Sequence, residues 1–242
     1  MRIAVISDVH GNIHALDAVL EAIDADEVDM IWCLGDVVGY GARPNECCAA
    51  VAARARISLV GNHDLGVLGK IPLDVFAHEA AESARWTQTV LDDASRSYLA
   101  ALSPNAETDY ASLAHASPRD PIWEYVLGID QARAALDTAT RPLVLVGHSH
   151  AALYFENGAS ARWGLAPEGT VLGLEEGSRC LLNPGSVGQP RDGDPQAAWL
   201  LLDLDEARAS FRRESYDVAR TQAEIRDAGL PAELAQRLTG GS

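Results

Sequence analysis

Short apolar runs alternate with segments of helical periodicity over the first 150 residues of the chain. The β-branched run at 2–7 predicts a buried strand, and apolar residues spaced three and four apart predict a helix over 13–23. The same alternation predicts these further elements: strand 30–34, helix 45–54, strand 57–60, strand 110–114, helix 129–138 and strand 142–146. Such alternation is typical of an α/β core with crossover helices.

Two other segments follow different patterns. Residues 72–102 carry apolar residues at helical spacing only, which predicts two or three helices inserted between strands. After His150, apolar runs separated by Gly- and Pro-rich turns predict strands, and 217–238 predicts a helical tail. These strands are expected at 152–156, 170–174, 179–183, 197–204 and 207–214. Since the sequence has no repeat, low-complexity tract or linker, one domain over 1–242 is the simplest interpretation.

The composition is that of an ordinary soluble protein, with 48% hydrophobic and 22% charged residues. No apolar run approaches the roughly 18 residues that a membrane-spanning helix needs. The first apolar run passes directly into Asp8 and His10 without a small-residue cleavage site, so we expect a cytoplasmic protein without a membrane partner. The four cysteines lack the spacing of a disulfide framework or zinc site and are expected to be reduced.

The excess of acidic over basic residues limits the kinds of partner that the chain is expected to bind. With a formal net charge of −16, the chain is not expected to bind nucleic acid or to act as a nuclease, because such binding relies on Lys and Arg. A small phosphorylated substrate would need positive charge concentrated at one point, which metal ions supply. A homo-oligomer built through 72–102 or through the C-terminal helices is left open.

Metal-ligand side chains follow five of the predicted strands. In chain order the motifs are Asp8-Val9-His10, Gly35-Asp36, Gly61-Asn62-His63-Asp64, His115 and Gly147-His148-Ser149-His150. Because ligands bind outside the carboxyl ends of strands in open α/β sheets, we expect these side chains to meet at one edge. Five of the seven histidines belong to this set, which makes chance an unsatisfactory explanation.

The spacing within these motifs has physical reasons. In an extended segment, residues i and i+2 point the same way, so Asp8 and His10 can aim at one site, as can His148 and His150. Glycines in front of three ligands let the backbone pass close to a crowded centre. The two oxygens of Asp36 can bridge two cations. Imidazole nitrogen with carboxylate or amide oxygen, without thiolate, suits manganese, iron, zinc or nickel.

The order DVH, GD, GNHD, H, GHSH over residues 8–150 resembles the calcineurin-like metallophosphoesterases. The stretches 35–46 and 181–194 are similar to the small bacterial and archaeal phosphodiesterase-like members, although Ala116 stands where such proteins often have glycine. The resemblance implies an α/β fold with a central sandwich of two mixed sheets flanked by helices. It also implies hydrolysis of a phosphate ester, as a phosphodiesterase or broad-specificity phosphatase, by a hydroxide bridging two divalent metals, with manganese favoured.

The resemblance assigns roles to individual residues. The first metal would be held by Asp8, His10, Asp36 and His150. The second would be held by Asp36, Asn62, His115 and His148, with Asp36 bridging. His63 would donate a proton or positive charge to the leaving oxygen, with Asp64 orienting the His63 ring.

Three residues outside this set are candidates for contact with the substrate. Arg119 and Arg191 lie in predicted loops and could fork onto a phosphate, with a surface ion pair as the alternative. Asn12 could contact phosphate near a helix N-terminus, although capping that helix is the simpler role.

Two further features bear on the shape of the site. The stretch NPGSV at 183–187 predicts a tight turn beside it. Trp86 and Trp123 could line a substrate cleft, but aromatic residues in such contexts are more often part of the core, which is the interpretation favoured here.

The alternative function is a metal-bound binding scaffold that keeps the fold and has little catalytic activity. Loss of a ligand, and above all of the residue at the position of His63, would indicate a scaffold. Because the full set is present in this sequence, the enzyme is favoured.

Overall fold

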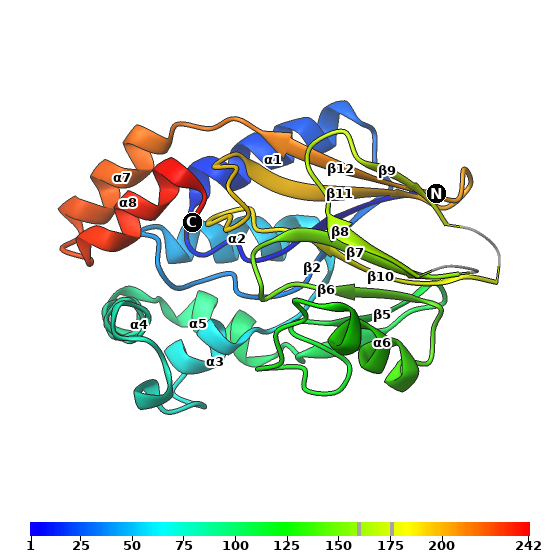
Figure 1. Ribbon diagram of the computed structural model, residues 1–242. Coiled ribbons are helices and arrows are strands. Elements are labelled where there is room, and N and C mark those ends of the chain that lie inside the picture. The colour runs from blue at the N-terminus through cyan, green and yellow to red at the C-terminus, as the bar shows by residue number, and fades with distance from the viewer. Residues whose placement is uncertain (159–160, 175–176) are drawn as a thin grey trace.

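The computed structural model describes residues 1–158, 161–174 and 177–242. Two six-stranded mixed sheets form a sandwich, with helices on the outer face of each sheet (Figure 1). Apolar side chains of both sheets, including Val5 and Leu200 of one and Leu145 and Leu182 of the other, share one buried cluster between them. The expected sandwich of two mixed sheets flanked by helices is therefore confirmed.

The first sheet has the strand order β3-β2-β1-β11-β12-β9. Its strands are β1 (Arg2–Ile6), β2 (Met30–Cys33), β3 (Ala55–Ser58), β9 (Val171–Gly173), β11 (Ala197–Asp203) and β12 (Arg208–Glu214). The first three strands are parallel to one another, and β1 pairs antiparallel with β11. Along β1, Ile3 and Val5 face the other sheet while Ala4 and Ile6 face the helices, because successive side chains alternate across a strand.

The second sheet has the strand order β4-β5-β6-β10-β7-β8. Its strands are β4 (Asn105–Glu107), β5 (Ala111–Ala114), β6 (Leu143–Val146), β7 (Ala152–Asn157), β8 (Ala161–Leu165) and β10 (Arg179–Pro184). The strands β5, β6 and β10 are parallel, whereas β7 pairs antiparallel with β10. The carboxyl ends of β5 and β6 thus point the same way along this sheet.

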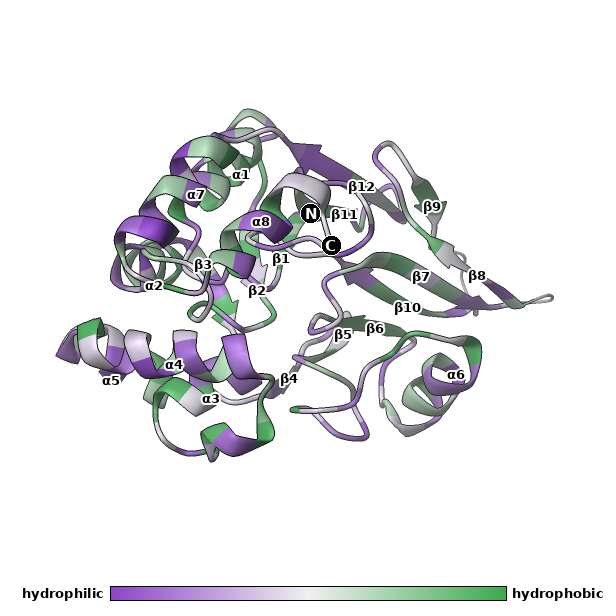
Figure 2. Ribbon diagram, turned by 60° about the vertical axis from the view of Figure 1, so that its left-hand side comes forward, coloured by the Kyte–Doolittle hydropathy of each residue, from purple (hydrophilic) through white to green (hydrophobic). Residues whose placement is uncertain are grey.

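The helices cover both faces of the sandwich. Helices α1 (Ile13–Ala25) and α2 (Pro44–Arg54) pack on the first sheet, and α6 (Ile129–Thr138) packs on the second. The C-terminal helices α7 (Val218–Asp227) and α8 (Ala232–Gly240) pack against each other. In Figure 2, α1 and α7 lie on one side of the strands and α6 on the other.

The segment between β3 and β4 is helical, as the sequence predicts for 72–102. It contains the short helices α3 (Asn62–Val67) and η1 (Leu73–Val75), followed by α4 (His78–Val90) and α5 (Asp93–Ala100). Helix α3 was not predicted, because six residues are too few to display a helical period. Strand β3 begins two residues before the predicted 57–60, directly after α2. Strands β4 and β8 were also missed, since neither shows a clear apolar alternation.

All four cysteines are free and buried, and burial raises the pKa of the Cys33 and Cys180 thiols to about 12. Such thiols are unreactive at neutral pH. Among the described residues, no helix combines the length and the hydropathy that crossing a bilayer would require.

The loop after β10 passes so close to the loop after β1 that only glycine fits. A Cβ on Gly188 would lie 1.9 Å from the carbonyl oxygen of Val9. We expect Gly188→Ala to lower the free energy of unfolding by about 2–3 kcal/mol, because backbone rather than a flexible side chain must move. In the control Gly240→Ala, the nearest atom is Ser242 Oγ at 3.7 Å, and stability should be kept or slightly raised. Urea denaturation followed by circular dichroism measures both, and equal midpoints would contradict the close approach.

Candidate metal centre

The predicted ligands leave their strands through sharply turned backbone. Five of them have a left-handed conformation, with φ between 51° and 64°: Asp8, His10, Asp36, His148 and His150. The expectation that Asp8 to His10 and His148 to His150 are extended is therefore wrong. The turns persist because neighbouring loops hold one another: the amide of Asp8 donates to the carbonyl of Gly35, and that of His10 to Asp36. The side chains converge through these contacts rather than through strand alternation.

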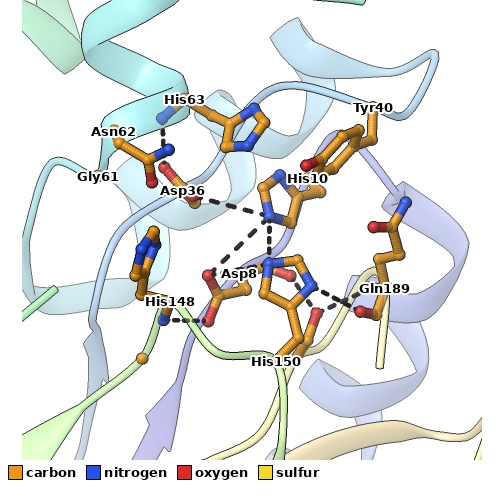
Figure 3. Close-up of polar contacts among 12 residues, drawn as sticks. Asp8, His10, Asp36, Tyr40, Gly61, Asn62, His63, His148, His150 and Gln189 are labelled. Atoms are coloured by element: carbon orange, nitrogen blue, oxygen red, sulfur yellow. Dashed lines mark hydrogen bonds and ion pairs between the residues drawn. The ribbon is translucent and has the colours of Figure 1, made fainter. Parts of the chain in front are cut away.

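The first group of candidate ligands consists of Asp8, His10 and His150. Their ligand atoms lie within 4.8 Å of one another, and all three side chains are buried (Figure 3). His10 Nε2 is 3.0 Å from His150 Nε2, and Asp8 Oδ1 is 3.9 Å from the first of these nitrogens and 3.5 Å from the second. His150 thus belongs with the residues of the β1 loop and not with its near neighbour His148.

The second group consists of Asp36, His115 and His148, again within 4.8 Å and buried. His115 Nε2 lies 3.4 Å from Asp36 Oδ2 and 3.2 Å from Asn62 Oδ1. The same Asp36 oxygen lies 3.7 Å from His10 Nε2 of the first group. Asp36 is therefore adjacent to both groups. The strands that supply the ligands belong to both sheets. The ligands therefore meet at one end of the sandwich, where the ends of strands from both sheets lie together, and not at the edge of a single sheet.

Backbone carbonyls fix the protonation of three of these rings. Nδ1 of His10 donates to Val38, 3.1 Å away, and Nδ1 of His115 donates to Leu34 at 2.9 Å. Nδ1 of His150 donates to the carbonyl of Gln189 at 2.7 Å. Because a carbonyl only accepts, the Nε2 of a neutral ring is left as a lone pair. Such outer hydrogen bonds orient metal-binding histidines.

The chemistry of the donor set fits cations. With Nδ1 protonated, His10 and His150 direct two lone pairs at each other across 3.0 Å, a repulsion that a shared cation would remove. Asp8 Oδ1, Asp36 Oδ2 and His148 Nε2 are buried without a hydrogen-bond partner among the described residues. Buried polar atoms of this kind are costly unless they bind something. Nitrogen and oxygen donors without sulfur suit a borderline divalent ion.

Opposing effects act on the charges of the second group. Burial would raise the pKa of Asp36, but the positive charge of His115 and the neighbouring imidazoles outweigh it and hold that pKa well below its usual range. Burial lowers and Asp36 raises the pKa of His115, which reaches about 9. A proton on His115 therefore offsets the carboxylate when no metal is present.

His63 lies at the start of α3, beside both groups. Its amide donates to Asp36 Oδ1 at 2.9 Å, and its ring centroid is 4.4 Å from that of Tyr40 and 5.2 Å from that of Phe76. Burial lowers the pKa of His63 to about 4, so the ring is neutral at pH 7. Its Nδ1 is buried without a hydrogen-bond partner among the described residues.

Asp64 has other partners than the His63 ring. One carboxylate oxygen accepts from the amide of Val38 and the other from the amide of Gly61, each at 3.0 Å. These bonds join the loop after β2 to the start of α3. The expectation that Asp64 orients the His63 ring is therefore replaced by a role in holding the backbone around the site.

Arg191 lies next to the candidate centre. Its Nη2 donates to the Tyr40 hydroxyl at 3.2 Å and to Gln189 Oε1 at 2.8 Å, and its amide donates to the carbonyl of His150. The guanidinium carbon sits 5.6 Å from the Tyr40 ring centroid. Two hydrogen bonds leave most of the five guanidinium N–H donors for a ligand.

The other two substrate candidates have structural partners. Arg119 is exposed and forms an ion pair of 3.3 Å with Glu124, which is the alternative that the sequence left open. Asn12 accepts from the amide of Ala15 at 3.2 Å and donates to the carbonyl of Gly188 at 2.9 Å. Asn12 therefore caps α1, as the simpler interpretation predicted.

The predicted turn at 183–187 lies against the site. Gly185 has φ 83°, the Ser186 hydroxyl donates to the carbonyl of Asp8 at 2.7 Å, and the Val187 amide donates to Ser7. Asn183 and Pro184 still belong to β10, and the residues after them support the left-handed conformation of Asp8 through backbone contacts. The predicted position beside the site is confirmed, whereas the first two residues are strand and not turn.

Several residues beside the site were not identified from the sequence. Tyr40, with φ 56°, packs on His10 and His63, and the carbonyl of Gln189 orients His150. Gly39 and Gly41, on either side of Tyr40, were the sequence feature that could have pointed to this position. Trp123 is 38% exposed, so its interpretation as a core residue is wrong, whereas Trp86 packs against a buried cluster. Trp123 lies in a loop whose position depends on tertiary contacts.

Comparison with known proteins gives concordant results. Residues 1–207 match the calcineurin-like phosphoesterase superfamily domain. An uncharacterized protein of Methanocaldococcus jannaschii is 39% identical over 243 residues, which span 98% of this chain and 96% of that protein. A solved structure of a metallophosphoesterase from Sphaerobacter thermophilus is 40% identical, with a TM-score of 0.90 over 100% of this chain and 99% of its own. A hypothetical protein from Pyrococcus horikoshii shares the fold at 20% identity, with a TM-score of 0.80 over 100% of this chain and 98% of its own.

The domain match covers most of the 242 residues, and its boundaries include every candidate ligand described above. The relatives align over nearly their full lengths. The chain therefore belongs to the calcineurin-like phosphoesterase superfamily and is a metal-dependent phosphoester hydrolase.

Proposed function

We propose that the protein hydrolyses phosphate esters, as a phosphodiesterase or a broad-specificity phosphatase, at a centre of two divalent cations. The observation that carries the proposal is the position of Asp36 between the two ligand groups. Its Oδ2 is 3.7 Å from His10 Nε2 on one side and 3.4 Å from His115 Nε2 on the other. A carboxylate in this position can serve two ions at once.

Seven side chains would hold the cations. Asp8, His10, Asp36 and His150 would hold the first, and Asp36, Asn62, His115 and His148 the second. Two divalent ions bound there, with manganese favoured and iron, zinc or nickel possible from the donor set, would acidify water and neutralise phosphoryl charge. The complete set favours an enzyme over a binding scaffold of the same fold.

Two side chains of the protein would act directly on the substrate. The neutral His63 ring carries one N–H that can donate to the leaving oxygen, and its packing between Tyr40 and Phe76 limits its rotation. Arg191 is positioned by Tyr40 and Gln189 and can donate its remaining N–H groups to phosphoryl oxygens. Positive charge from Arg191 and the cations would offset the net charge of −16 locally.

Metal dependence and substrate class are tested together. We expect protein stripped of metal with a chelator to be inactive, and added Mn²⁺ to restore hydrolysis of bis-p-nitrophenyl phosphate. Parallel assays with p-nitrophenyl phosphate separate a phosphodiesterase from a broad-specificity phosphatase. Failure to hydrolyse either ester with Mn²⁺, Fe²⁺, Zn²⁺ or Ni²⁺ would refute the proposal.

Asp36→Asn is expected to lower the affinity for both ions. The amide removes the negative charge and one oxygen acceptor, so the metal content after dialysis should fall from about two to below one per chain. Elemental analysis measures this, with the exposed Asp17→Asn as a control that keeps wild-type content. Full occupancy in Asp36→Asn would show that Asp36 does not bridge.

His63→Ala is expected to separate metal binding from turnover. Because His63 is not among the proposed ligands, metal content should stay at the wild-type level, while kcat falls by roughly 10²–10⁴-fold through loss of the positioned N–H. His78→Ala is the control, since the His78 side chain is 77% exposed. An unchanged kcat in His63→Ala would remove this residue from the reaction.

A further inference from the structure

Apolar side chains are exposed at alternate positions in the segment that leads from β5 into α6. The exposed fractions are 38% for Trp123, 46% for Tyr125, 59% for Leu127 and 41% for Ile129. Isolated exposed apolar residues are ordinary, but four within seven residues form a surface that favours a ligand or partner.

The two aromatic members of this run lie beside the candidate centre, Tyr125 through direct contact and Trp123 through Phe76. The Tyr125 ring stacks on that of His148, with centroids 4.0 Å apart and an interplanar angle of 30°. Trp123 packs on Phe76 at 5.4 Å, and Phe76 packs edge-on against His63 at 5.2 Å. We call Phe76, Trp123 and Tyr125 the aromatic shelf. It touches a proposed metal ligand at one end and the proposed proton donor at the other.

Hydrogen bonds hold the loop that carries the shelf. Asp120 Oδ1 accepts from the amides of Ile122 and Trp123, each at 3.1 Å, and the amide of Ala116 donates to Pro121 at 3.0 Å. The shelf is therefore preorganised, which lowers the entropic cost of binding a rigid group on it.

Arg191 and His148 both border the proposed site of the phosphate. Arg191 Nη2 donates to the hydroxyl of Tyr40 at 3.2 Å, and the Tyr125 ring of the shelf stacks on the His148 ring. A phosphate bound by the cations and Arg191 would thus have flat, exposed rings directly beside it. Exposed rings bind planar groups by stacking, with little dependence on the identity of the base.

We propose that the aromatic shelf is a subsite for a planar aromatic group, a nucleobase or an aryl ring, carried by the phosphate ester. The proposal rests on the proposed function, since that function places the phosphate. Leu127 and Ile129 carry no aromatic ring and are not part of the aromatic shelf. A second copy of the chain, by contrast, would cover all four exposed side chains.

The test compares two ligands that share a phosphate and a sugar. We expect calorimetry with Mn²⁺-loaded protein to show adenosine 5′-monophosphate binding about 10-fold more tightly than ribose 5-phosphate, within the roughly 5- to 150-fold that stacking of one base contributes. In Trp123→Ala and Tyr125→Ala, adenosine 5′-monophosphate should bind no more than about 2–3-fold more tightly than ribose 5-phosphate. Trp123→Phe and Tyr125→Phe keep a planar ring and should keep most of the roughly 10-fold difference. Leu127→Ala is the matched control from the same segment and should keep the full ratio.

Binding of these two ligands requires no hydrolysis. The calorimetry therefore tests the aromatic shelf separately from the proposed hydrolytic function. Active protein that binds both ligands equally, or no binding of the nucleotide at all, would overturn the shelf. Inactive protein that keeps the 10-fold ratio and loses it in Trp123→Ala would support the shelf and refute the hydrolytic proposal. Sedimentation velocity tests whether a second copy of the chain occupies this surface instead. If the protein is a dimer that both Trp123→Ala and Leu127→Ala dissociate, and both variants also reduce the binding ratio, the surface is an interface and the subsite is overturned.

Discussion

The candidate centre depends on hydrogen bonds from histidine Nδ1 atoms to backbone carbonyls. In a neutral ring, each bond places the proton on the side away from the centre, so that Nε2 is presented as a lone pair. The clearest consequence is the pair His10 and His150, whose Nε2 atoms face each other at 3.0 Å. The carbonyls of Val38 and Gln189 fix this arrangement. The two facing lone pairs repel each other without a cation, and both can bind a cation when one is present. The backbone carbonyls therefore favour cation binding between these two rings.

Placing those carbonyls correctly requires a strained and crowded backbone. Left-handed conformation at five non-glycine residues costs on the order of 1–3 kcal/mol each. Glycine is required where loops cross: a Cβ on Gly61 would lie 2.1 Å from Asp36 Oδ1, and one on Gly147 would lie 2.0 Å from Ser7 Oγ. The buried clusters within and around the two sheets offset this cost. Among the described residues, left-handed non-glycine backbone is concentrated where the ligands meet, with Glu27 and Ala207 as the exceptions elsewhere.

The sequence was informative wherever structure is encoded locally. Apolar runs locate the strands, and the motifs that follow them locate Asp8, Asp36 and His148 at strand ends. Contacts between distant segments could not be predicted in this way. The grouping of His150 with the β1 loop depends on Gln189, and Asp64 bonds to Val38 across 26 positions. Trp123 was misassigned for the same reason, because its exposure follows from the loop and not from its neighbours in sequence.

The loop between β5 and α6 carries exposed aromatic rings and also contacts the candidate centre. Its Tyr125 ring covers one face of the His148 imidazole. Any ligand that shifts these aromatic rings therefore acts on a candidate metal ligand, and a cation bound by His148 acts on the rings in return. Because such coupling is reciprocal in free energy, a group bound on the rings changes the affinity for the cation by the same factor as the cation changes the affinity for that group.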